Sequence, residues 1–365
     1  MDSKKNWGNR PWRVDFRPQR RALPETVEFA VVGGGFAGLA AAVQLKSLAP
    51  AKSVALFEAE TIGAGASGHT GGVALAETAA GDLPGLGDVL AAYQQFIRDH
   101  KLQTNLHLPG CHELSRSNPL PHSPISWNDS GQLCVTKEVP GGTIDPGKTV
   151  SELARVAESM GVWIFENAPV ENAKFQNPLE LRIASGVVRA ENVLFATNAF
   201  ALELSTIPGH SAFTAAILTE PLPDDTLGAI GLADRKPFYT VDLPYLWGRL
   251  LGNSIIFGSG LIFFEDWREL RTLDIASGAA PEIFDRLERR VRNLHSALAN
   301  ITVTHRWGGP ICISDDWKPT FRRHPQSDNC LVLGAFSGHG VALSVYLGIW
   351  AAACLTGSRA LPNWA

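Results

Sequence analysis

Residues 31–42 constrain the fold most strongly, because they combine an apolar strand, a glycine-rich turn and an alanine-rich helix. The glycines of the turn, Gly33, Gly35 and Gly38, occupy the positions of the G-x-G-x-x-G fingerprint. The first glycine permits a tight turn, the second lets the backbone approach a pyrophosphate, and the third allows close helix–strand packing. The helix N-terminus then presents free N–H groups and a positive dipole end to the anion. The segment therefore predicts a dinucleotide-binding unit.

The residues around this turn fit the same unit. An apolar, strand-compatible run, 29–32, precedes the turn, and a proline-free stretch rich in alanine and leucine, 36–48, follows it. Residues 53–57 are predicted to form the next strand, which ends at Glu58. An acidic residue there is placed to accept hydrogen bonds from the ribose hydroxyls. A glycine-rich turn in an ordinary α/β unit is the alternative, but here strand, helix, second strand and acid occur together.

The rest of the chain is predicted to contain both helices and strands, after an irregular arm at residues 1–26. Apolar periodicity predicts helices at 89–100, 149–160, 282–299 and 341–355. Alternating or apolar runs predict hairpins at 125–139 and 179–190, and strands at 162–165, 192–196 and 255–258. An irregular connection rich in proline, histidine and serine is expected at 109–124.

Composition argues against several classes of protein. The chain has 365 residues and a net charge of −4, which does not fit a nucleic-acid footprint across the whole molecule. The apolar run at 341–355 is shorter than the ~20 residues that span a bilayer, so we expect a buried helix and no membrane span. The five cysteines are widely spaced and show no metal-binding or disulfide pattern, so a reducing, cytoplasmic location is expected.

The N-terminal arm is basic and aromatic. Its aromatic residues Trp7, Trp12 and Phe16 are interleaved with Lys4, Lys5, Arg10, Arg13, Arg17, Arg20 and Arg21. Such a segment can dock on an anionic partner, but packing over its own domain is the interpretation we favour.

Three further segments carry a resemblance to a known family. They are 62–72 (IGAGASGHTGG), 306–310 (RWGGP) with Asp316 and Pro319 following, and 334–343 (GAFSGHGVAL). Together with the fingerprint they resemble the FAD-dependent oxidoreductases of the D-amino-acid oxidase superfamily, most closely the gamma-glutamylputrescine oxidase-like branch. The resemblance extends over nearly the whole chain and implies FAD, in place of NAD, as the dinucleotide.

The resemblance also implies an α/β fold in two domains. An FAD-binding, Rossmann-like domain of the glutathione-reductase type is expected to be discontinuous, with residues 27–75, 143–200 and 305–365. A second, α+β substrate domain, built on a large mixed or antiparallel sheet, is expected from residues 76–142 and 201–304.

Candidate FAD contacts follow from the fingerprint and the resemblance. Ser67 and Gly68 can bring a hydroxyl and backbone N–H groups close to an anion. Some relatives attach flavin covalently, and His69 lies near the relevant loop, but the local pattern resembles the non-covalent members, so non-covalent FAD is expected. The candidate set is Gly33, Gly35, Phe36, Ala37, Gly38, Glu58, Ala59, Gly65, Ala66, Ser67, Gly68, Gly71, Gly72, Val170, Thr197, Asn198, Gly309, Gly338, His339, Gly340 and Val341.

The segment Gly338-His339-Gly340 gives a mechanistic hypothesis. It directly precedes the helix expected at 341–355, so its N–H groups and the helix dipole can face the N1–C2=O edge of the isoalloxazine. Two-electron reduction leaves negative charge on that edge, and preorganised donors stabilise it. A glycine-flanked turn that only begins a core helix is the alternative.

Enzymes of this family oxidise a C–N bond. Hydride transfer from a neutral amine to flavin N5 gives an imine, which then hydrolyses. In relatives that oxidise amino acids, an arginine that binds the substrate carboxylate follows the Trp-x-x unit, whereas this chain has Pro310 there. The resemblance therefore favours an amine or N-substituted amine as the small-molecule substrate.

The candidate catalytic residues are Tyr245, Trp247, Arg249 and His339. Tyr245 and Trp247 can stack against an amine or shield the flavin, although core packing is the commoner role of such side chains. Arg249 can reach an acidic group, and His339 is expected to act mainly through its backbone.

Other charged residues leave alternatives open. Asp316 can balance charge near the cofactor or cap a turn. Lys236 and Lys318 are the lysines that we consider for a cation near flavin N5, which would favour oxygen as the electron acceptor. The acceptor, oxygen or another, stays open.

Two other functions also stay open. An NAD-dependent dehydrogenase would use the same fingerprint, although the element at 337–341 argues against it. An FAD-binding subunit without catalysis of its own could dock its N-terminal arm on another protein.

Overall fold

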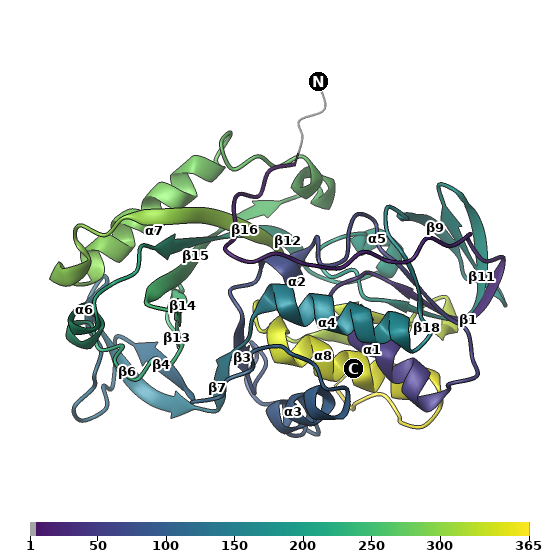
Figure 1. Ribbon diagram of the computed structural model, residues 1–365, viewed down its shortest axis with the longest axis horizontal. Coiled ribbons are helices and arrows are strands. Elements are labelled where there is room, and N and C mark those ends of the chain that lie inside the picture. Colours follow the sequence, from purple (N-terminus) through teal and green to yellow (C-terminus); the bar gives the residue numbers. More distant parts are fainter. Residues whose placement is uncertain (1–4, 365) are drawn as a thin grey trace.

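The computed structural model describes residues 5–364, which form two lobes, each built around an eight-stranded sheet (Figure 1). This mixed α/β architecture confirms the predicted fold class. Between the lobes lies a short two-stranded link, made of β3 (Val73–Leu75) and β7 (Gly141–Thr143).

The first sheet holds the glycine fingerprint. Its central strands pair in parallel, and only the edge pair β17–β18 and the branch through β10 and β9 are antiparallel. The order along the main path is β17 (Thr320–His324), β18 (Ser327–Gly334), β11 (Gly186–Phe195), β1 (Thr26–Val32), β2 (Val54–Phe57) and β8 (Trp163–Phe165). The branch adds β10 (Leu179–Ile183) and β9 (Val170–Lys174).

Helices cover one face of this sheet, and they share one apolar core with it: α1 (Phe36–Leu48), α3 (Val89–Asp99), α4 (Pro146–Ser159) and α8 (Gly340–Leu355). Small side chains let α1 and α8 approach closely, because Ala40, Ala41 and Ala42 are fully buried. At Gly348 of α8 an added Cβ would lie 2.3 Å from the carbonyl oxygen of Ala37. The bounds of α1 confirm the helix predicted at 36–48.

The second sheet forms the other lobe. All its neighbouring strands are antiparallel except β13 and β4, which pair in parallel. The amphipathic helix α7 (Ala280–Leu294) packs on it through Ile283, Phe284, Leu287 and Val291. The strand order is β16 (Val303–Ile313), β12 (His210–Thr219), β15 (Ser254–Phe264), β14 (Trp247–Leu251), β13 (Phe238–Thr240), β4 (Cys111–Ser115), β6 (Gln132–Val139) and β5 (Ser126–Asn128).

Short helices occupy the connections: α2 (Ala66–His69), α5 (Leu202–Ser205), α6 (Asp224–Ala229) and two 3-10 turns, Trp267–Arg271 and Ser296–Leu298.

Several predicted elements differ from the structure. The connection expected at 109–124 contains β4. Its sequence, CHELS, does not have the apolar pattern of a strand, but β4 pairs with β13 on one side and β6 on the other. The hairpin strand and the separate strand expected between 187 and 196 are one strand, β11. The helix at 149–160 begins earlier, because Asp145 accepts a hydrogen bond from the Lys148 N–H and Pro146 starts the first turn. The helix at 282–299 ends at Leu294, where extended His295 caps a 3-10 turn.

The division into two domains stays a proposal. Two elements lie in the other lobe from the one that this division predicts. Residues 305–313 were assigned to the first domain, but they belong to β16, which pairs with β12 in the second sheet. Helix α3 was assigned to the second domain, but its buried side chains Val89, Tyr93 and Phe96 belong to the apolar core of the first lobe. Both elements lie where the chain passes between the lobes, so sequence order does not assign them.

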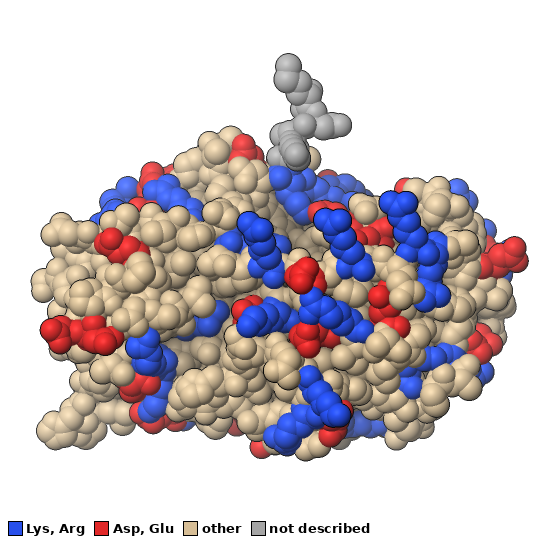
Figure 2. All heavy atoms as spheres, in the orientation of Figure 1, with Lys and Arg blue, Asp and Glu red and all other residues tan. Residues whose placement is uncertain are grey.

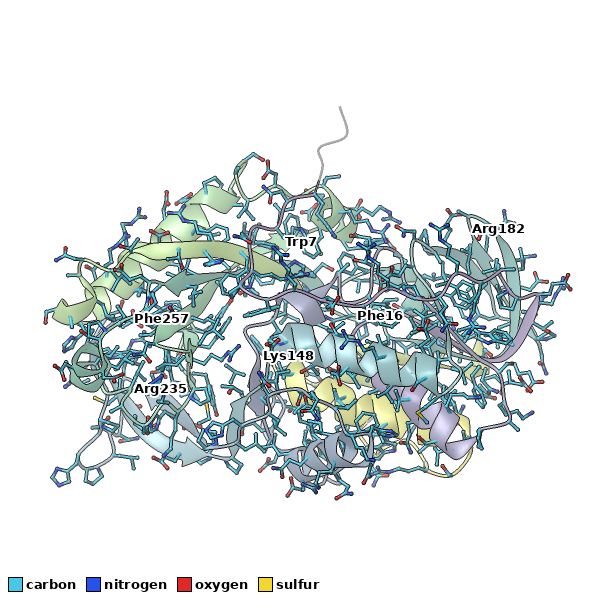
Figure 3. The ribbon with its side chains drawn as sticks, in the orientation of Figure 1. Trp7, Phe16, Lys148, Arg182, Arg235 and Phe257 are labelled. Carbon is cyan, nitrogen blue, oxygen red and sulfur yellow. The ribbon has the colours of Figure 1, made fainter. Side chains whose placement is uncertain are left out.

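The described part of the N-terminal arm packs along its own chain (Figure 3). Trp7 is buried in the core of the second lobe, and backbone hydrogen bonds join residues 7–9 to residues 306–308 of β16. Trp12 is buried edge-on against Trp307, and Phe16 packs on the core of the first lobe. Lys4 lies outside the described residues. Figure 2 shows Lys and Arg side chains mixed with Asp and Glu on this face.

Within residues 5–364, no helix is both long and apolar enough to cross a bilayer.

The contact at Gly348 gives a prediction for stability. Gly348→Ala is expected to destabilise the protein by about 1–3 kcal/mol, because its methyl group must displace the α1 backbone. The free energy of unfolding in urea measures the effect. Gly228→Ala in α6 is the control, because a Cβ there has open space, and it is expected to be neutral or slightly stabilising. Equal stability of both variants would contradict the packing described here.

Candidate active site

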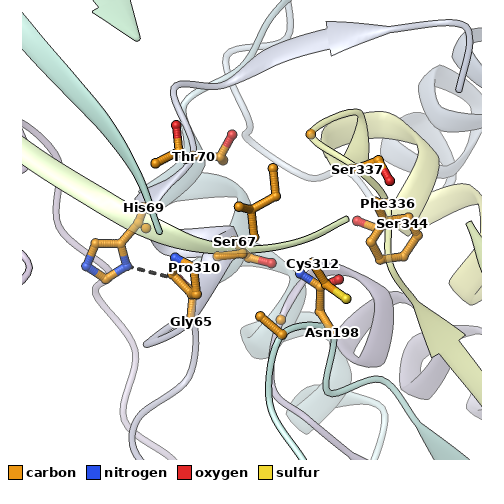
Figure 4. A pocket seen from close by; sticks show the side chains of 18 of the residues that line it. Gly65, Ser67, His69, Thr70, Asn198, Pro310, Cys312, Phe336, Ser337 and Ser344 are labelled. Atoms are coloured by element: carbon orange, nitrogen blue, oxygen red, sulfur yellow. Dashed lines mark hydrogen bonds between the residues drawn. The ribbon is translucent and has the colours of Figure 1, made fainter. Parts of the chain in front are cut away.

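A cavity of about 770 Å³ extends from the fingerprint of the first lobe to strands of the second sheet (Figure 4). This volume is typical of ligand and cofactor pockets. In the view of Figure 4, His69 lies at one side and Phe336, Ser337 and Ser344 at the other, with Ser67 between them.

The fingerprint turn leaves room for an anion. Gly33 has a φ of +113°, which favours glycine, and a Cβ at Gly35 would lie 2.8 Å from the Ser67 hydroxyl oxygen. That hydroxyl accepts a hydrogen bond of 2.9 Å from the N–H of Phe36, so α2 is fastened to the start of α1. A Cβ at Gly38 would lie 2.0 Å from the Gly33 carbonyl oxygen, so this glycine allows helix–strand packing.

Glu58 lies beyond the turn, at the end of β2. Its Oε2 accepts a hydrogen bond of 2.8 Å from the Gly34 N–H, and its Oε1 accepts one of 2.9 Å from the Glu60 N–H. Burial raises the pKa of this carboxyl, and these backbone donors oppose the rise. Glu58 lines the cavity together with Ala59 and Val170, so an acceptor for hydroxyl groups is available at this end.

The N-terminal arm holds helix α2 in place. Trp12 Nε1 donates to the Gly68 carbonyl at 2.8 Å, and Trp307 Nε1 donates to the His69 carbonyl at 3.0 Å. The Arg10 guanidinium lies 2.7 Å from His69 Nε2, while His69 Nδ1 lies 2.9 Å from the Gly65 carbonyl. These contacts assign the proton of a neutral imidazole to Nδ1. Burial and the nearby Arg10 lower the pKa of His69 to about 3.

The N-terminus of α8 reaches the same cavity. Ser337 and Gly338 have left-handed φ values of 48° and 90°, and they lead into His339, Gly340 and the first turn of the helix. Burial lowers the pKa of His339. One turn further, the buried Ser344 hydroxyl lines the cavity and has no hydrogen-bond partner within the described chain. A positive dipole end and a free hydroxyl therefore face the cavity.

Most of the predicted cofactor contacts line this cavity. Those that do not are Gly38, Gly68 and Gly72, whose added Cβ atoms would meet backbone carbonyl oxygens at 2.0, 2.2 and 2.6 Å. They shape the turns behind the cavity wall. The lining members are Gly33, Gly35, Phe36, Ala37, Glu58, Ala59, Gly65, Ala66, Ser67, Gly71, Val170, Thr197, Asn198, Gly309, Gly338, His339, Gly340 and Val341.

Two of the predicted catalytic side chains, Tyr245 and Trp247, form part of the cavity wall. Tyr245 lines the cavity, but its hydroxyl is engaged by Thr214 Oγ1 at 2.6 Å and by the Gly260 carbonyl at 2.8 Å. Trp247 lines the cavity with its ring beside two glycines, since a Cβ at Gly71 or Gly258 would lie 2.1 Å from ring atoms. The packing role is therefore visible at both positions.

Arg249 does not line the cavity, contrary to the prediction that it reaches an acidic group there. It is buried behind the wall, where its Nε donates to the Gly71 carbonyl at 2.5 Å. Burial lowers its pKa to about 10, and the charge of Asp145 opposes this shift. Arg249 follows Trp247 by two residues on β14, so both side chains lie on the same face of the strand, and Arg249 supports the Gly71 turn from behind the cavity wall.

The lysines considered for a cation near flavin N5 also lie away from the cavity. Lys318 pairs with Asp316, and Lys236 pairs with Glu138 at 2.8 Å. Asp316 Oδ1 accepts a hydrogen bond from the Lys318 N–H, so Asp316 caps a turn, and its alternative role in charge balance has no support.

Sequence analysis missed many of the side chains that line the cavity, among them Glu77, Glu113, Tyr239 and Ser344. The first three come from separate segments: the pairing of β4 with β13 places Glu113 beside Tyr239, and a hydrogen bond joins Tyr239 to Glu77 in the loop after β3. Ser344 had a readable signal, because it is a polar residue one turn into an apolar helix.

These observations together fit a dinucleotide cofactor. The turn is free of Cβ atoms, an acidic side chain stands at the ribose position, and the unpartnered Ser344 hydroxyl faces the far end of the same cavity.

Comparisons with known proteins agree with this geometry. The profile of the DAO family, described as FAD dependent oxidoreductase, matches residues 28–354. The chain is 24% identical to the "Probable oxidoreductase OrdL" of Rhizobium meliloti (strain 1021), over 92% of this chain and 86% of that protein.

Solved structures share the fold. L-proline dehydrogenase from P. horikoshii superposes with a TM-score of 0.74 at 18% identity, covering 93% of this chain and 95% of that one. Glycine oxidase from Geobacillus kaustophilus gives a TM-score of 0.72 at 17% identity, covering 94% and 98% of the two chains.

The neutral state of His69 predicts a pH dependence. Its folded pKa of about 3 lies below its ordinary value of 6.5, so its contribution to stability is complete above pH 6.5 and is lost as the pH falls toward 3. In that window the loss is about 1.4 kcal/mol per pH unit from this group. We expect the free energy of unfolding to fall more steeply with acid in the wild type than in His69→Gln, which keeps both hydrogen-bonding roles without a titrating group.

Urea unfolding at pH 7, 6 and 5 measures this difference. Parallel pH curves for the two proteins would show that His69 titrates normally in the folded state.

Proposed function

We propose that this chain, which belongs to the DAO family of FAD dependent oxidoreductases, oxidises the C–N bond of an amine or an N-substituted amine. Its cofactor is FAD, which corrects the NAD-dependent alternative raised from the fingerprint alone. The observation that carries the proposal is one continuous cavity, in which the FAD cradle opens directly onto the acidic and aromatic residues of the second sheet. The named reactions of the proline dehydrogenase and the glycine oxidase support chemistry at an amino group.

The residues assigned to FAD divide along the cavity. The fingerprint turn, with Ser67, would hold the pyrophosphate, and Glu58 would hold the ribose. The N-terminus of α8 and the Ser344 hydroxyl would border the flavin. Bound FAD supplies a centre that accepts two electrons as a hydride.

The N-terminal turn of α8 contributes electrostatics. Its aligned N–H groups and dipole place partial positive charge at the cavity, where reduction creates negative charge. Burial lowers the pKa of His339, which favours its neutral imidazole, so this side chain adds no positive charge to the α8 turn. We assign to His339 this neutral, backbone-centred role.

The cavity wall would position the substrate. Tyr245, Trp247 and Pro310 present apolar surface there, and no carboxylate-binding arginine stands at position 310. We infer that a neutral amine lies against this wall and that its α-C–H bond would give a hydride to bound FAD; the iminium left behind releases a proton to water and is hydrolysed to a carbonyl compound and an amine or ammonia.

We also propose that FAD is bound non-covalently. Both ring nitrogens of His69 are engaged, one by Arg10 and the other by the Gly65 carbonyl. All five cysteines are free and buried, which supports a reducing location, the cytoplasm.

Anaerobic spectroscopy tests the proposed reaction. The purified protein is expected to be yellow, and n-butylamine, N-methylbutylamine or 1,4-diaminobutane is expected to bleach the flavin band, whereas the matched alcohol 1-butanol leaves it unchanged. Flavin that is bound but is reduced by no amine or amino acid would contradict catalysis and favour the non-catalytic subunit. After denaturation and filtration the flavin is expected in the filtrate; retention with the chain would contradict non-covalent binding.

A further inference from the structure

Arg249 on β14 is a buried cation that has no opposite charge directly beside it. It is 5% exposed, and its Nη2 has no hydrogen-bond partner within the described chain. The acidic residue whose charge acts on it is Asp145, which caps α4 by accepting a hydrogen bond of 2.9 Å from the Lys148 N–H. Burial lowers the pKa of Arg249 to about 10, so the guanidinium is still positively charged at neutral pH.

The contacts of Arg249 do not require this charge. Its Nε donates to the Gly71 carbonyl, and its guanidinium carbon lies 5.9 Å from the centre of the Trp12 ring. A neutral amide side chain could also donate to one carbonyl, without the free-energy cost of burying an unpaired charge. The packing of the described chain therefore gives no reason for a cation here, whereas a bound group that carries negative charge would.

Gly71 and Gly72 connect this charge with the cavity. The Gly71 carbonyl accepts the hydrogen bond from Arg249, and Gly71 itself lines the cavity. At Gly72 an added Cβ would lie 3.3 Å from Arg249 Nη2, so the guanidinium packs directly on this turn. Because Gly71 has no side chain, one layer of backbone lies between the guanidinium and the cavity.

Gly71 also lies where the cofactor cradle meets the second sheet. The Trp247 ring of β14 packs against it, since a Cβ at Gly71 would be 2.1 Å from ring atoms. A cofactor that is held by the fingerprint turn and reacts with a substrate at the second sheet must bring its reacting ring to this junction. We therefore expect the charge of Arg249 to lie behind the flavin end of the cofactor and not behind its pyrophosphate.

We propose that the positive charge of Arg249 raises the reduction potential of bound FAD. This inference rests on the FAD binding in the proposed function, but not on the amine substrate. A hydride brings two electrons and one proton to the oxidised flavin and so leaves one negative charge on the reduced ring. A fixed cation in a buried position stabilises this charged ring more than the neutral oxidised ring, because the low dielectric there weakens screening.

Substitutions of Arg249 separate its charge from its hydrogen bond. Arg249→Gln keeps an N–H donor for the Gly71 carbonyl and removes the charge, whereas Arg249→Lys keeps the charge. In Arg249→Gln the equilibrium constant for two-electron reduction is expected to fall about tenfold, which corresponds to a potential lower by about 30 mV. Arg249→Lys is expected to retain most of the wild-type potential. The matched control is Arg286→Gln, at an exposed arginine on α7, which is expected to leave the potential unchanged.

Two measurements on the FAD-loaded protein need no amine. The potential is measured by anaerobic reduction against a reference dye, and sulfite binding is followed by the loss of the flavin band. Sulfite adds reversibly to oxidised flavin and also leaves negative charge on the ring, so its dissociation constant is expected to rise about tenfold in Arg249→Gln.

These measurements separate the inference from the proposed reaction. If no amine reduces the flavin but both quantities change as expected, the proposed oxidation fails and the role of Arg249 stands. If amines reduce the flavin but Arg249→Gln has the potential and the sulfite affinity of the wild type, the role of Arg249 is refuted. Weaker FAD binding by Arg249→Gln at an unchanged potential would also refute it, because a cation near the pyrophosphate acts equally on both oxidation states.

Asp145→Asn tests the same charge without altering Arg249, in case the Arg249 variants do not fold or do not retain FAD. Asparagine keeps the cap of α4 and removes the negative charge that opposes Arg249. The potential of Asp145→Asn is expected to lie above that of the wild type. An unchanged potential would show that the flavin does not sense charge on this side of the cavity and would overturn the proposal.

Discussion

The close approach of α1 to its neighbours is the constraint on which the rest of the structure depends. At Gly38 the helix meets the carbonyl of Gly33, and at Ala37 it meets Gly348 of α8, in each case at a distance that leaves no room for a side chain. Because α1 lies so deep, its N-terminus, the α2 loop and the N-terminus of α8 all border one cavity. The cofactor cradle is thus a consequence of packing in the core.

The N-terminal arm adds a second constraint, because it packs on both lobes and, between them, on helix α2 of the cofactor site. Trp7 is anchored in the second lobe, Trp12 and Arg10 hold α2, and Phe16 packs on the first lobe. The basic residues that suggested a partner are therefore partly used within the chain, with Arg10 on His69 and Lys5 on Glu60. The arm belongs to the cofactor site as much as to the surface.

Features that depend on local chemistry could be predicted from the sequence. Glycine fixes where the backbone turns and approaches other atoms, so the fingerprint, α1 and the α8 turn could be located. Features that depend on strand pairing could not: β16 crosses into the second sheet, and β4 pairs with β13 across more than a hundred residues of sequence. Arg249 is held behind the cavity wall by its hydrogen bond to the Gly71 carbonyl, and Glu77 and Glu113 both reach Tyr239 only in the folded protein. Spacing along the chain carries no information about such encounters.

The strand order also has a consequence for biosynthesis. β1, the first strand to leave the ribosome, lies between β2 and β11, and β11 pairs in turn with β18, which is among the last segments made. Helix α8, which packs on α1, is synthesised later still. The N-terminal arm cannot form its hydrogen bonds to β16 until that strand has been made. A nascent chain therefore leaves part of the apolar surface of its first βαβ unit uncovered until β18 and α8 have been made, and such exposed surface favours aggregation.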